Sequence, residues 1–126
     1  FLGRIESETV PQFLKNASFL VLASPTSVRS TTTMPCKVGE YLCTANPVVV
    51  TNLGEIPKYL TDGVSAFLPE PDSPENFAIG LEKAMNTDMG TLISIGKEGY
   101  KVAEANFNSA VQTKRIVDFL IELSKK

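Results

Sequence analysis

From Phe1 to Pro69, apolar positions alternate between short β-rich runs and stretches with helical spacing. Continuous apolar runs at 18–23 and 47–51 predict two strands buried between layers of helices, because a strand with one face in water would alternate polar and apolar residues. A shorter strand is predicted at 66–68. Strands that alternate with helices are typical of a mostly parallel α/β sheet.

Helical spacing of apolar residues predicts six helices, at 8–17, 36–45, 54–60, 74–85, 92–106 and 109–124. Ser7 and Ser73 are expected to cap the first and fourth of them, because a serine hydroxyl accepts a hydrogen bond from an amide of the first turn. Gly96 and Gly99 weaken the fifth by roughly 1 kcal/mol each relative to alanine, unless they permit close packing against a neighbour.

The segment 24–35, which follows the first predicted strand, is rich in Ser, Thr and Pro and carries one charge, Arg29. This composition predicts an irregular loop without a regular element. In doubly wound sheets, ligands bind at the carboxyl ends of the strands, where such loops lead into helices. We therefore expect a ligand site at this loop and at the start of the next helix.

That helix begins after Pro35 and offers groups suited to an anionic ligand. The amides of Cys36 and Lys37 have no partner within the helix and attract phosphate, and the Lys37 side chain adds a positive charge. Glu40 has two oxygens that suit a pair of sugar hydroxyls. Lys37 and Glu40 equally fit an ordinary surface ion pair, worth only about 0.3 kcal/mol.

Composition narrows the classes of function. The 126 residues carry a net charge of -2, with Lys and Arg spread along the chain, so no nucleic-acid partner is expected. The lack of histidine excludes a Cys/His zinc site and a histidine base, and no carboxylate cluster suits another metal. Cys36 and Cys43 are expected to be reduced, partly buried thiols of an intracellular protein.

The chain contains no apolar run of membrane-spanning length, and Phe1-Leu2-Gly3 lacks the features of a signal peptide. We therefore expect a cytoplasmic protein. The start on the strand-like pair Phe1-Leu2, without methionine, indicates a fragment of a longer chain.

Several short segments follow one another in a specific order: FLGRI at 1–5, VPQFLKNA at 10–17, FLVLASP at 19–25, PCKVGEYL at 35–42, NPVVVT at 46–51, GEIPKYL at 54–60 and PEPD at 69–72. In order and spacing they resemble the C-terminal domain of the family-4 retaining glycosyltransferases, over nearly the whole chain. The most specific part is K-x-x-E-Y-L followed by P-V-V.

The resemblance implies that residues 1–126 form one domain, a Rossmann-like parallel sheet flanked by helices, which is the C-terminal half of a two-domain GT-B glycosyltransferase. In that family this domain binds a nucleoside diphosphate sugar, and the N-terminal domain, absent here, holds the acceptor, a glycan or lipid-linked molecule. The parent transfers a hexose in the cytoplasm, at the inner face of the membrane, without cofactor or metal. The isolated domain is expected to be inactive, and its last helix, which in the family crosses to the N-terminal domain, to expose apolar residues.

Carried over to this sequence, the resemblance assigns donor-binding roles but no catalytic residue. Ile5 falls where the backbone lines the nucleobase pocket, and Glu40 matches the second glutamate of the Glu-x7-Glu signature, which binds the ribose hydroxyls. The helix start that meets the diphosphate and the sugar corresponds to Thr33, Met34, Pro35, Cys36 and Lys37.

The sequence departs from the family at Thr32, which stands in place of the first glutamate of that signature. The departure indicates a subgroup with a Pro-x-Lys-x-x-Glu-Tyr form and leaves the contacts to the sugar unassigned. Arg29 can reach the site from its loop or lie in solvent. Two alternatives stay open: a non-catalytic α/β binding or regulatory module, and half of a sugar-nucleotide epimerase of the same architecture.

Overall fold

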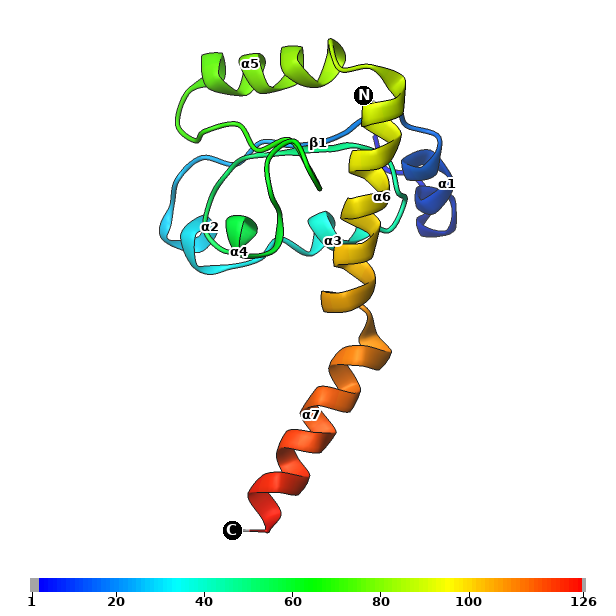
Figure 1. The fold of residues 1–126 in the computed structure, drawn as a ribbon, viewed down its shortest axis with the longest axis vertical. Helices are drawn as coiled ribbons and strands as arrows, with labels where there is room; N and C mark the ends of the chain where they lie inside the picture. Colours follow the sequence, from blue (N-terminus) through cyan, green and yellow to red (C-terminus); the bar gives the residue numbers. More distant parts are fainter. Residues whose placement is uncertain (1–2, 126) are drawn as a thin grey trace.

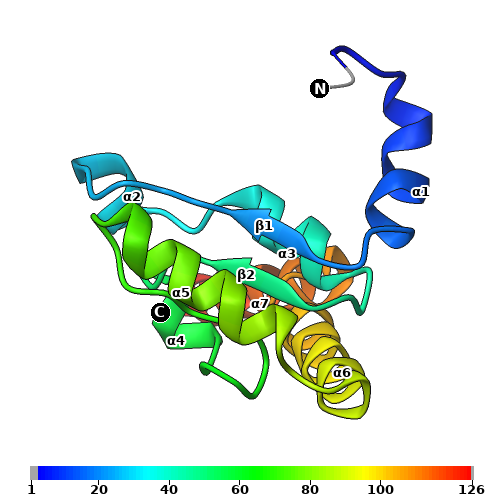
Figure 2. The ribbon, with the colours of Figure 1, turned by 90° about the horizontal axis from the view of Figure 1, so that it is seen from above.

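The centre of the fold is a parallel pair of strands with helices on both faces (Figures 1 and 2). The computed structural model describes residues 3–125, so the strand-like start predicted at Phe1-Leu2 lies outside the described residues, as does Lys126. Strand β1 (Leu20–Leu22) pairs with β2 (Val48–Val50). The predicted parallel α/β sheet is confirmed.

The segment predicted as a third strand extends this sheet through a single parallel bridge between Val49 and Phe67. The amide of Phe67 donates to the carbonyl of Val48 at 2.8 Å, and the amide of Val50 donates to the carbonyl of Phe67 at 3.0 Å. These bonds make β2 the central strand, and all three of its residues are buried. The prediction of a buried strand at 47–51 is therefore confirmed.

The helices of the described chain are η1 (Ser7–Thr9), α1 (Val10–Lys15), α2 (Val28–Thr32), α3 (Cys36–Leu42), α4 (Ile56–Tyr59), α5 (Pro74–Met85), α6 (Met89–Asn106) and α7 (Ser109–Ser124). All six predicted helices are present, although the first three are shorter than expected. The Ser73 cap is confirmed, because its hydroxyl accepts from the amide of Asn76 at 3.2 Å. The Ser7 cap is wrong, because Ser7 is the first residue of η1 and Thr9 precedes α1.

The core has one part on each face of the strands. On one face, Val38 and Leu42 of α3 and Ile56 of α4 pack with residues of β1 and β2. On the other face, Val49 and Phe67 pack with helices α5 and α6. Figure 1 shows α5 on one side of the strands and α3 and α4 on the other.

The prediction for β1 is wrong in one respect, because the strand is not buried on both faces. Leu20 is 5% exposed, but Val21 is 41% exposed. The reason is that α5 packs over β2, where it covers Val49, and not over β1. An apolar run shows which residues can be buried, but the neighbours decide which of them are.

The segment 24–35 is not wholly irregular, since α2 lies within it. Two serines stabilise this turn reciprocally: the amide of Ser30 donates to the hydroxyl of Ser27 at 3.1 Å, and the amide of Ser27 donates to the hydroxyl of Ser30 at 2.8 Å. These bonds satisfy amides that a helix start leaves without partners. Propensity alone, which treats Ser and Thr as helix-avoiding residues, therefore missed α2.

Helix α6 packs closely against two turns through Gly96 and Gly99. A Cβ atom on Gly96 would lie 2.0 Å from the carbonyl oxygen of Ala45, and one on Gly99 would lie 2.7 Å from that of Ser65. Both glycines are buried and admit backbone at a distance that a side chain would block. Their predicted cost to helix propensity is thus offset by close packing.

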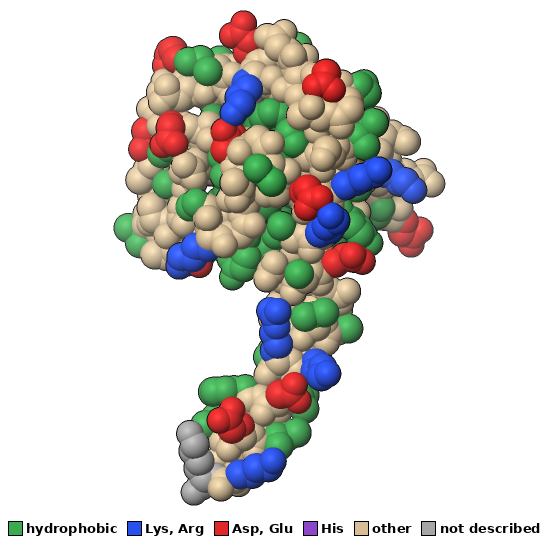
Figure 3. All heavy atoms as spheres, viewed as in Figure 1, with side chains coloured by type: hydrophobic (Ala, Val, Ile, Leu, Met, Phe, Trp, Pro, Cys, Tyr) green, Lys and Arg blue, Asp and Glu red, His purple; other side chains and the backbone are tan. Residues whose placement is uncertain are grey.

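Helix α7 projects away from the rest of the molecule (Figure 1) and has no buried residue. Its apolar side chains lie on the surface (Figure 3). Phe119, for example, is 59% exposed. The expected exposure of apolar residues on this helix is confirmed. None of the helices in residues 3–125 is both long enough and apolar enough to cross a bilayer.

Both cysteines are free, as expected, but they are exposed and not partly buried. Cys36 is the first residue of α3 and Cys43 is its C-cap, whereas the inner face of the helix consists of Val38 and Leu42. The helical phase therefore turns both thiols away from the core.

Candidate functional site

Two surface hollows lie beside consecutive turns of α3. The loop hollow has a volume of about 440 Å³ and is lined by Ser24, Pro25, Ser27, Arg29, Ser30, Thr33, Met34, Pro35 and Cys36. The α1 hollow has a volume of about 660 Å³ and is lined by Ser7, Val10, Pro11, Leu14, Lys15, Glu40, Cys43 and Thr44. Helix α3 thus contributes Cys36 to one hollow and Glu40 to the other, which Cys43 and Thr44, just after the helix, also line.

The residues predicted to bind a ligand are divided between these hollows. Four of them line the loop hollow together: Thr33, Met34, Pro35 and Cys36. Glu40 lines the α1 hollow instead. Lys37 is exposed and lines neither hollow, and Ile5 is half-buried just before η1, whose Ser7 lines the α1 hollow. Their roles as ligand contacts stay predictions.

The alternative interpretation of Lys37 and Glu40 as a surface ion pair does not apply. In the part of the chain that the structure describes, ion pairs join Lys58 to Glu55, Lys83 to Asp62 and Lys101 to Glu98. Lys37 and Glu40 are not among them, so both charges are available to other groups.

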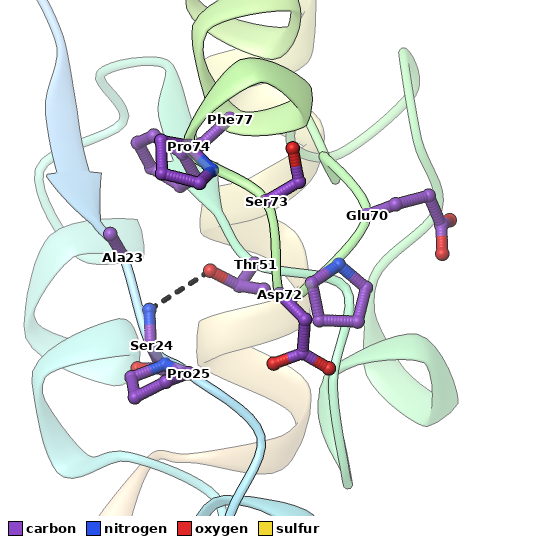
Figure 4. A pocket seen from close by; sticks show the side chains of 10 residues that line it. Ala23, Ser24, Pro25, Thr51, Glu70, Asp72, Ser73, Pro74 and Phe77 are labelled. Atoms are coloured by element: carbon purple, nitrogen blue, oxygen red, sulfur yellow. Dashed lines mark hydrogen bonds between the residues drawn. The ribbon is translucent and has the colours of Figure 1, made fainter.

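The loop hollow is adjacent to a third hollow, of about 530 Å³, at the carboxyl ends of the strands (Figure 4). Ser24 and Pro25 line both. The amide of Ser24 donates to the hydroxyl of Thr51 at 3.0 Å, drawn as the dashed line in Figure 4, and this bond ties the end of β1 to the end of β2. The position agrees with the expected site at the carboxyl ends of parallel strands.

Two contacts hold the loop that carries α2. The carboxylate of Asp72 accepts hydrogen bonds from the amide and the hydroxyl of Thr26. These bonds lower the pKa of Asp72 below its usual value. On the other side of the loop, a Cβ atom on Gly54 would lie 2.4 Å from the carbonyl oxygen of Ser30, and the φ angle of Gly54 is +60°. Only glycine fits there without displacing α2.

The α1 hollow contains residues that the sequence did not indicate as site residues. They come from η1 and α1, such as Ser7, Val10 and Leu14, and line the same hollow as Glu40. Asn46 positions α1, because its side-chain amide donates to the carbonyl oxygens of Leu14 at 3.1 Å and Lys15 at 3.0 Å. In the sequence, Asn46 indicated only the end of the helix predicted at 36–45 and not this contact with α1.

The two hollows beside α3 carry few charged groups, whereas Glu70 and Asp72 line the third hollow. Glu40 and Lys15 line the α1 hollow, and Arg29 lines the loop hollow. Within residues 3–125, no group of three or more side chains of the metal-binding types gathers at one point. In the two hollows beside α3, hydroxyl and thiol groups therefore provide most of the polar lining.

Comparison with known proteins decides the family. Residues 1–87 match the sequence model of Glycosyl transferases group 1. The chain belongs to this family. This match confirms the family resemblance inferred from the order and spacing of the short sequence segments. No curated protein matches the chain significantly.

Solved structures of glycosyltransferases share the fold of this family member. HepE from Anabaena, crystallised with UDP-glucose, superposes with a TM-score of 0.76 at 18% identity, over 90% of this chain and 30% of HepE. The C-terminal domain of LpcC, a glycosyl transferase group 1 protein from Francisella tularensis, gives 0.70 at 22% identity, over 86% of this chain and 53% of that one.

Sucrose-phosphate synthase from Thermosynechococcus elongatus gives a TM-score of 0.75 at 17% identity, over 99% of this chain and 30% of the synthase. The chain therefore spans about a third of the length of HepE and of the synthase. At these identities the comparison establishes the fold, and the predicted GT-B class is confirmed.

Proposed function

We propose that the chain binds a nucleoside diphosphate sugar and that the protein to which it belongs transfers the sugar to an acceptor. Membership of the glycosyl transferases group 1 family supports this function. HepE, which has the same fold, was crystallised with UDP-glucose and also with UDP. The proposal assigns the donor to the two hollows beside α3.

The observation that carries the proposal is the different character of these two hollows. The α1 hollow has apolar walls from Val10, Pro11 and Leu14, which suit a flat base, and one carboxylate, Glu40. A carboxylate accepts hydrogen bonds from two neighbouring hydroxyls, as a ribose offers them. We assign the nucleoside to this hollow, with Ile5 close to the base and Glu40 on the ribose.

The loop hollow suits the diphosphate and the sugar. Its lining has hydroxyls of Ser24, Ser27 and Thr33 and contains no carboxylate. The bond between the anomeric carbon and the β-phosphate oxygen breaks during transfer, so negative charge grows on the leaving diphosphate. Donors placed around that oxygen before the reaction stabilise the charge and thereby lower the barrier.

Thr32, which replaces the first signature glutamate, does not line the loop hollow. Its hydroxyl donates to the carbonyl of Val28 at 2.7 Å, within α2. We therefore propose no contact between Thr32 and the sugar. The hydroxyls of Ser24 and Thr33 are the candidates for that role.

We further propose that the acceptor is a glycan or a lipid-linked molecule, held by a domain outside this sequence, and that transfer takes place in the cytoplasm at the inner face of the membrane. No metal or other cofactor is assigned to the reaction. These parts of the proposal follow from the family resemblance.

Titration by calorimetry tests the donor assignment. The chain is titrated with UDP, GDP and ADP, and then with the 2′-deoxy form of the diphosphate that binds best. If Glu40 holds the ribose hydroxyls, loss of the 2′-hydroxyl weakens binding about tenfold in the wild type and has little effect in Glu40→Gln. Glu82→Gln, an exposed carboxylate on α5, is the matched control.

Equal loss on 2′-deoxy substitution in wild type and Glu40→Gln would remove Glu40 from the ribose site. If none of the three diphosphates binds, either to this chain or to a longer protein that includes it, the proposed function is wrong.

A further inference from the structure

The loop hollow contains one positive charge and no negative charge. Among the described residues that line it, Arg29 is the only charged side chain, and Cys36, the first residue of α3, lines the same hollow. Arg29 belongs to α2, a helix that the sequence did not predict. The family resemblance gives this position no role, so any function of Arg29 has to be argued from its surroundings.

The charge of Arg29 is not neutralised within the protein. In residues 3–125 the three ion pairs involve lysines, and Arg29 takes part in none of them. The lining of the hollow contains no Asp or Glu side chain with which it could pair. An anion that binds in the hollow would therefore not have to displace a carboxylate from Arg29.

The backbone that carries Arg29 is held in place. The hydroxyl of Thr33 donates to the carbonyl of Arg29 at 2.7 Å, and the hydroxyl of Ser30 donates to the carbonyl of Pro25 at 2.7 Å. Gly54 packs closely against the backbone carbonyl of Ser30. Because α2 is fixed, an anion would have to order only the side chain of Arg29, which reduces the entropy lost on binding.

Arginine is the side chain best suited to hold a phosphate group. Its planar guanidinium donates two parallel hydrogen bonds to a pair of phosphate oxygens, and it stays charged at every pH at which proteins fold. The hydroxyl of Ser24 borders the same space and supplies a neutral donor for another oxygen, whereas the Thr33 hydroxyl already donates to the carbonyl of Arg29. The guanidinium and the hydroxyl together suit a doubly charged group better than a neutral sugar.

We propose that Arg29 binds the diphosphate of the donor in the loop hollow. The inference rests on the proposed function, which it deepens by adding a binding residue that the family pattern does not include. It also provides a positive charge at the leaving diphosphate, close to the position where Thr32 replaces a glutamate.

Calorimetric titration of Arg29 variants tests the proposal. Wild type, Arg29→Ala and Arg29→Lys are titrated with UDP, GDP and ADP, with the matching nucleosides, and with inorganic pyrophosphate. The matched control is Arg115→Ala, because Arg115 is an exposed arginine of α7, far from α2 (Figure 1).

If Arg29 holds the diphosphate, Arg29→Ala weakens binding of the diphosphate about tenfold or more and that of the nucleoside less than about twofold. Arg29→Lys recovers part of the loss, because lysine keeps the charge and loses the fork of donors. The dependence of affinity on salt becomes shallower in Arg29→Ala only. Arg115→Ala behaves as wild type.

The outcomes separate this inference from the proposed function. If a diphosphate binds and Glu40→Gln weakens it while Arg29→Ala does not, the donor site stands and the role of Arg29 is overturned. If pyrophosphate binds through Arg29 but no nucleotide does, the anion site stands and the donor function is overturned. If neither pyrophosphate nor any nucleotide binds the wild type, both are overturned.

Discussion

The carboxylate of Asp72 holds Thr26 by two hydrogen bonds, from the amide at 2.8 Å and from the hydroxyl at 2.5 Å. The two residues are 46 positions apart in the sequence, so this contact ties the loop after β1 to the turn before α5. Asp72 adopts a left-handed backbone conformation, with a φ angle of 64°. Asp and Asn tolerate this conformation better than other side chains do, apart from glycine.

This contact is expected to depend on pH. The hydrogen bonds from Thr26 lower the pKa of Asp72 below 3.8, the value for an unperturbed aspartate. A carboxyl group whose pKa is lower in the folded state stabilises that state above the unfolded pKa, and this stabilisation is lost as the pH falls through the folded pKa. The amide NMR signal of Thr26 should therefore titrate with a midpoint below 3.8.

In Asp72→Asn, which keeps tolerance of the left-handed conformation, that titration should be absent. A midpoint at or above 3.8 in the wild type would contradict the hydrogen bonds described for Asp72.

Gly96→Ala is expected to destabilise the fold by about 3 kcal/mol, because the added methyl group overlaps backbone and forces α6 away from the connection between α3 and β2. A Cβ atom there would lie 2.0 Å from the carbonyl oxygen of Ala45. The control is Gly39→Ala, where the nearest atom, in Phe107, is 3.6 Å away. That variant should be neutral or gain up to about 1 kcal/mol from helix propensity. Urea unfolding of both measures the difference, and equal midpoints would disprove the close contact.

Two phenylalanines should respond very differently to truncation. Phe67 is 1% exposed and packs beneath α5, whereas Phe119 on α7 is 59% exposed. Phe67→Ala is expected to cost about 3–5 kcal/mol of unfolding free energy, since it removes buried contacts and leaves a cavity. Phe119→Ala should change it by less than about 0.5 kcal/mol. Thermal unfolding followed by circular dichroism compares them, and a comparable loss for Phe119→Ala would mean that α7 is packed in solution.

The two exposed cysteines provide a test of how the donor lies. Cys36 lines the loop hollow and Cys43 lines the α1 hollow. In Cys43→Ser and Cys36→Ser, the remaining thiol can be followed by its rate of reaction with a colorimetric disulfide reagent. A nucleoside should slow the reaction of Cys43 only, whereas the diphosphate sugar should slow both, because a bound ligand blocks access to the sulfur. Protection of Cys36 by the nucleoside alone would reverse the proposed orientation.

Sequence patterns predicted the fold where local and global preferences agree. The predicted strand at 47–51 contains three consecutive valines, 48–50, which form the buried central strand β2. Ser73 followed by Pro74 predicted the start of α5 correctly. The exposure of Val21 in β1 was not predictable in the same way, because it depends on where α5 packs.

The candidate site was only partly predictable, because one part of it follows from local sequence patterns and the other depends on long-range contacts. The position of the loop before α3 follows from the rule that ligands bind at the ends of parallel strands, and four of the predicted residues do line one hollow. The second hollow, beside Glu40, needs α1 to lie against α3. That placement depends on hydrogen bonds from Asn46 to residues about 30 positions away, which no local pattern reveals.

Because Gly54 lies directly against the backbone of α2, substitutions at position 54 and substitutions on α2 itself should affect the loop hollow differently. Any larger residue at 54 would push α2 outward, because backbone meets backbone there, with a Cβ position only 2.4 Å from the Ser30 carbonyl. Exposed side chains of α2 that line the hollow, such as that of Arg29, are under no such constraint. Exchange of side chains on α2 can therefore alter which ligand the hollow accepts while its backbone frame stays in place, and this makes α2 the natural place to redesign ligand preference.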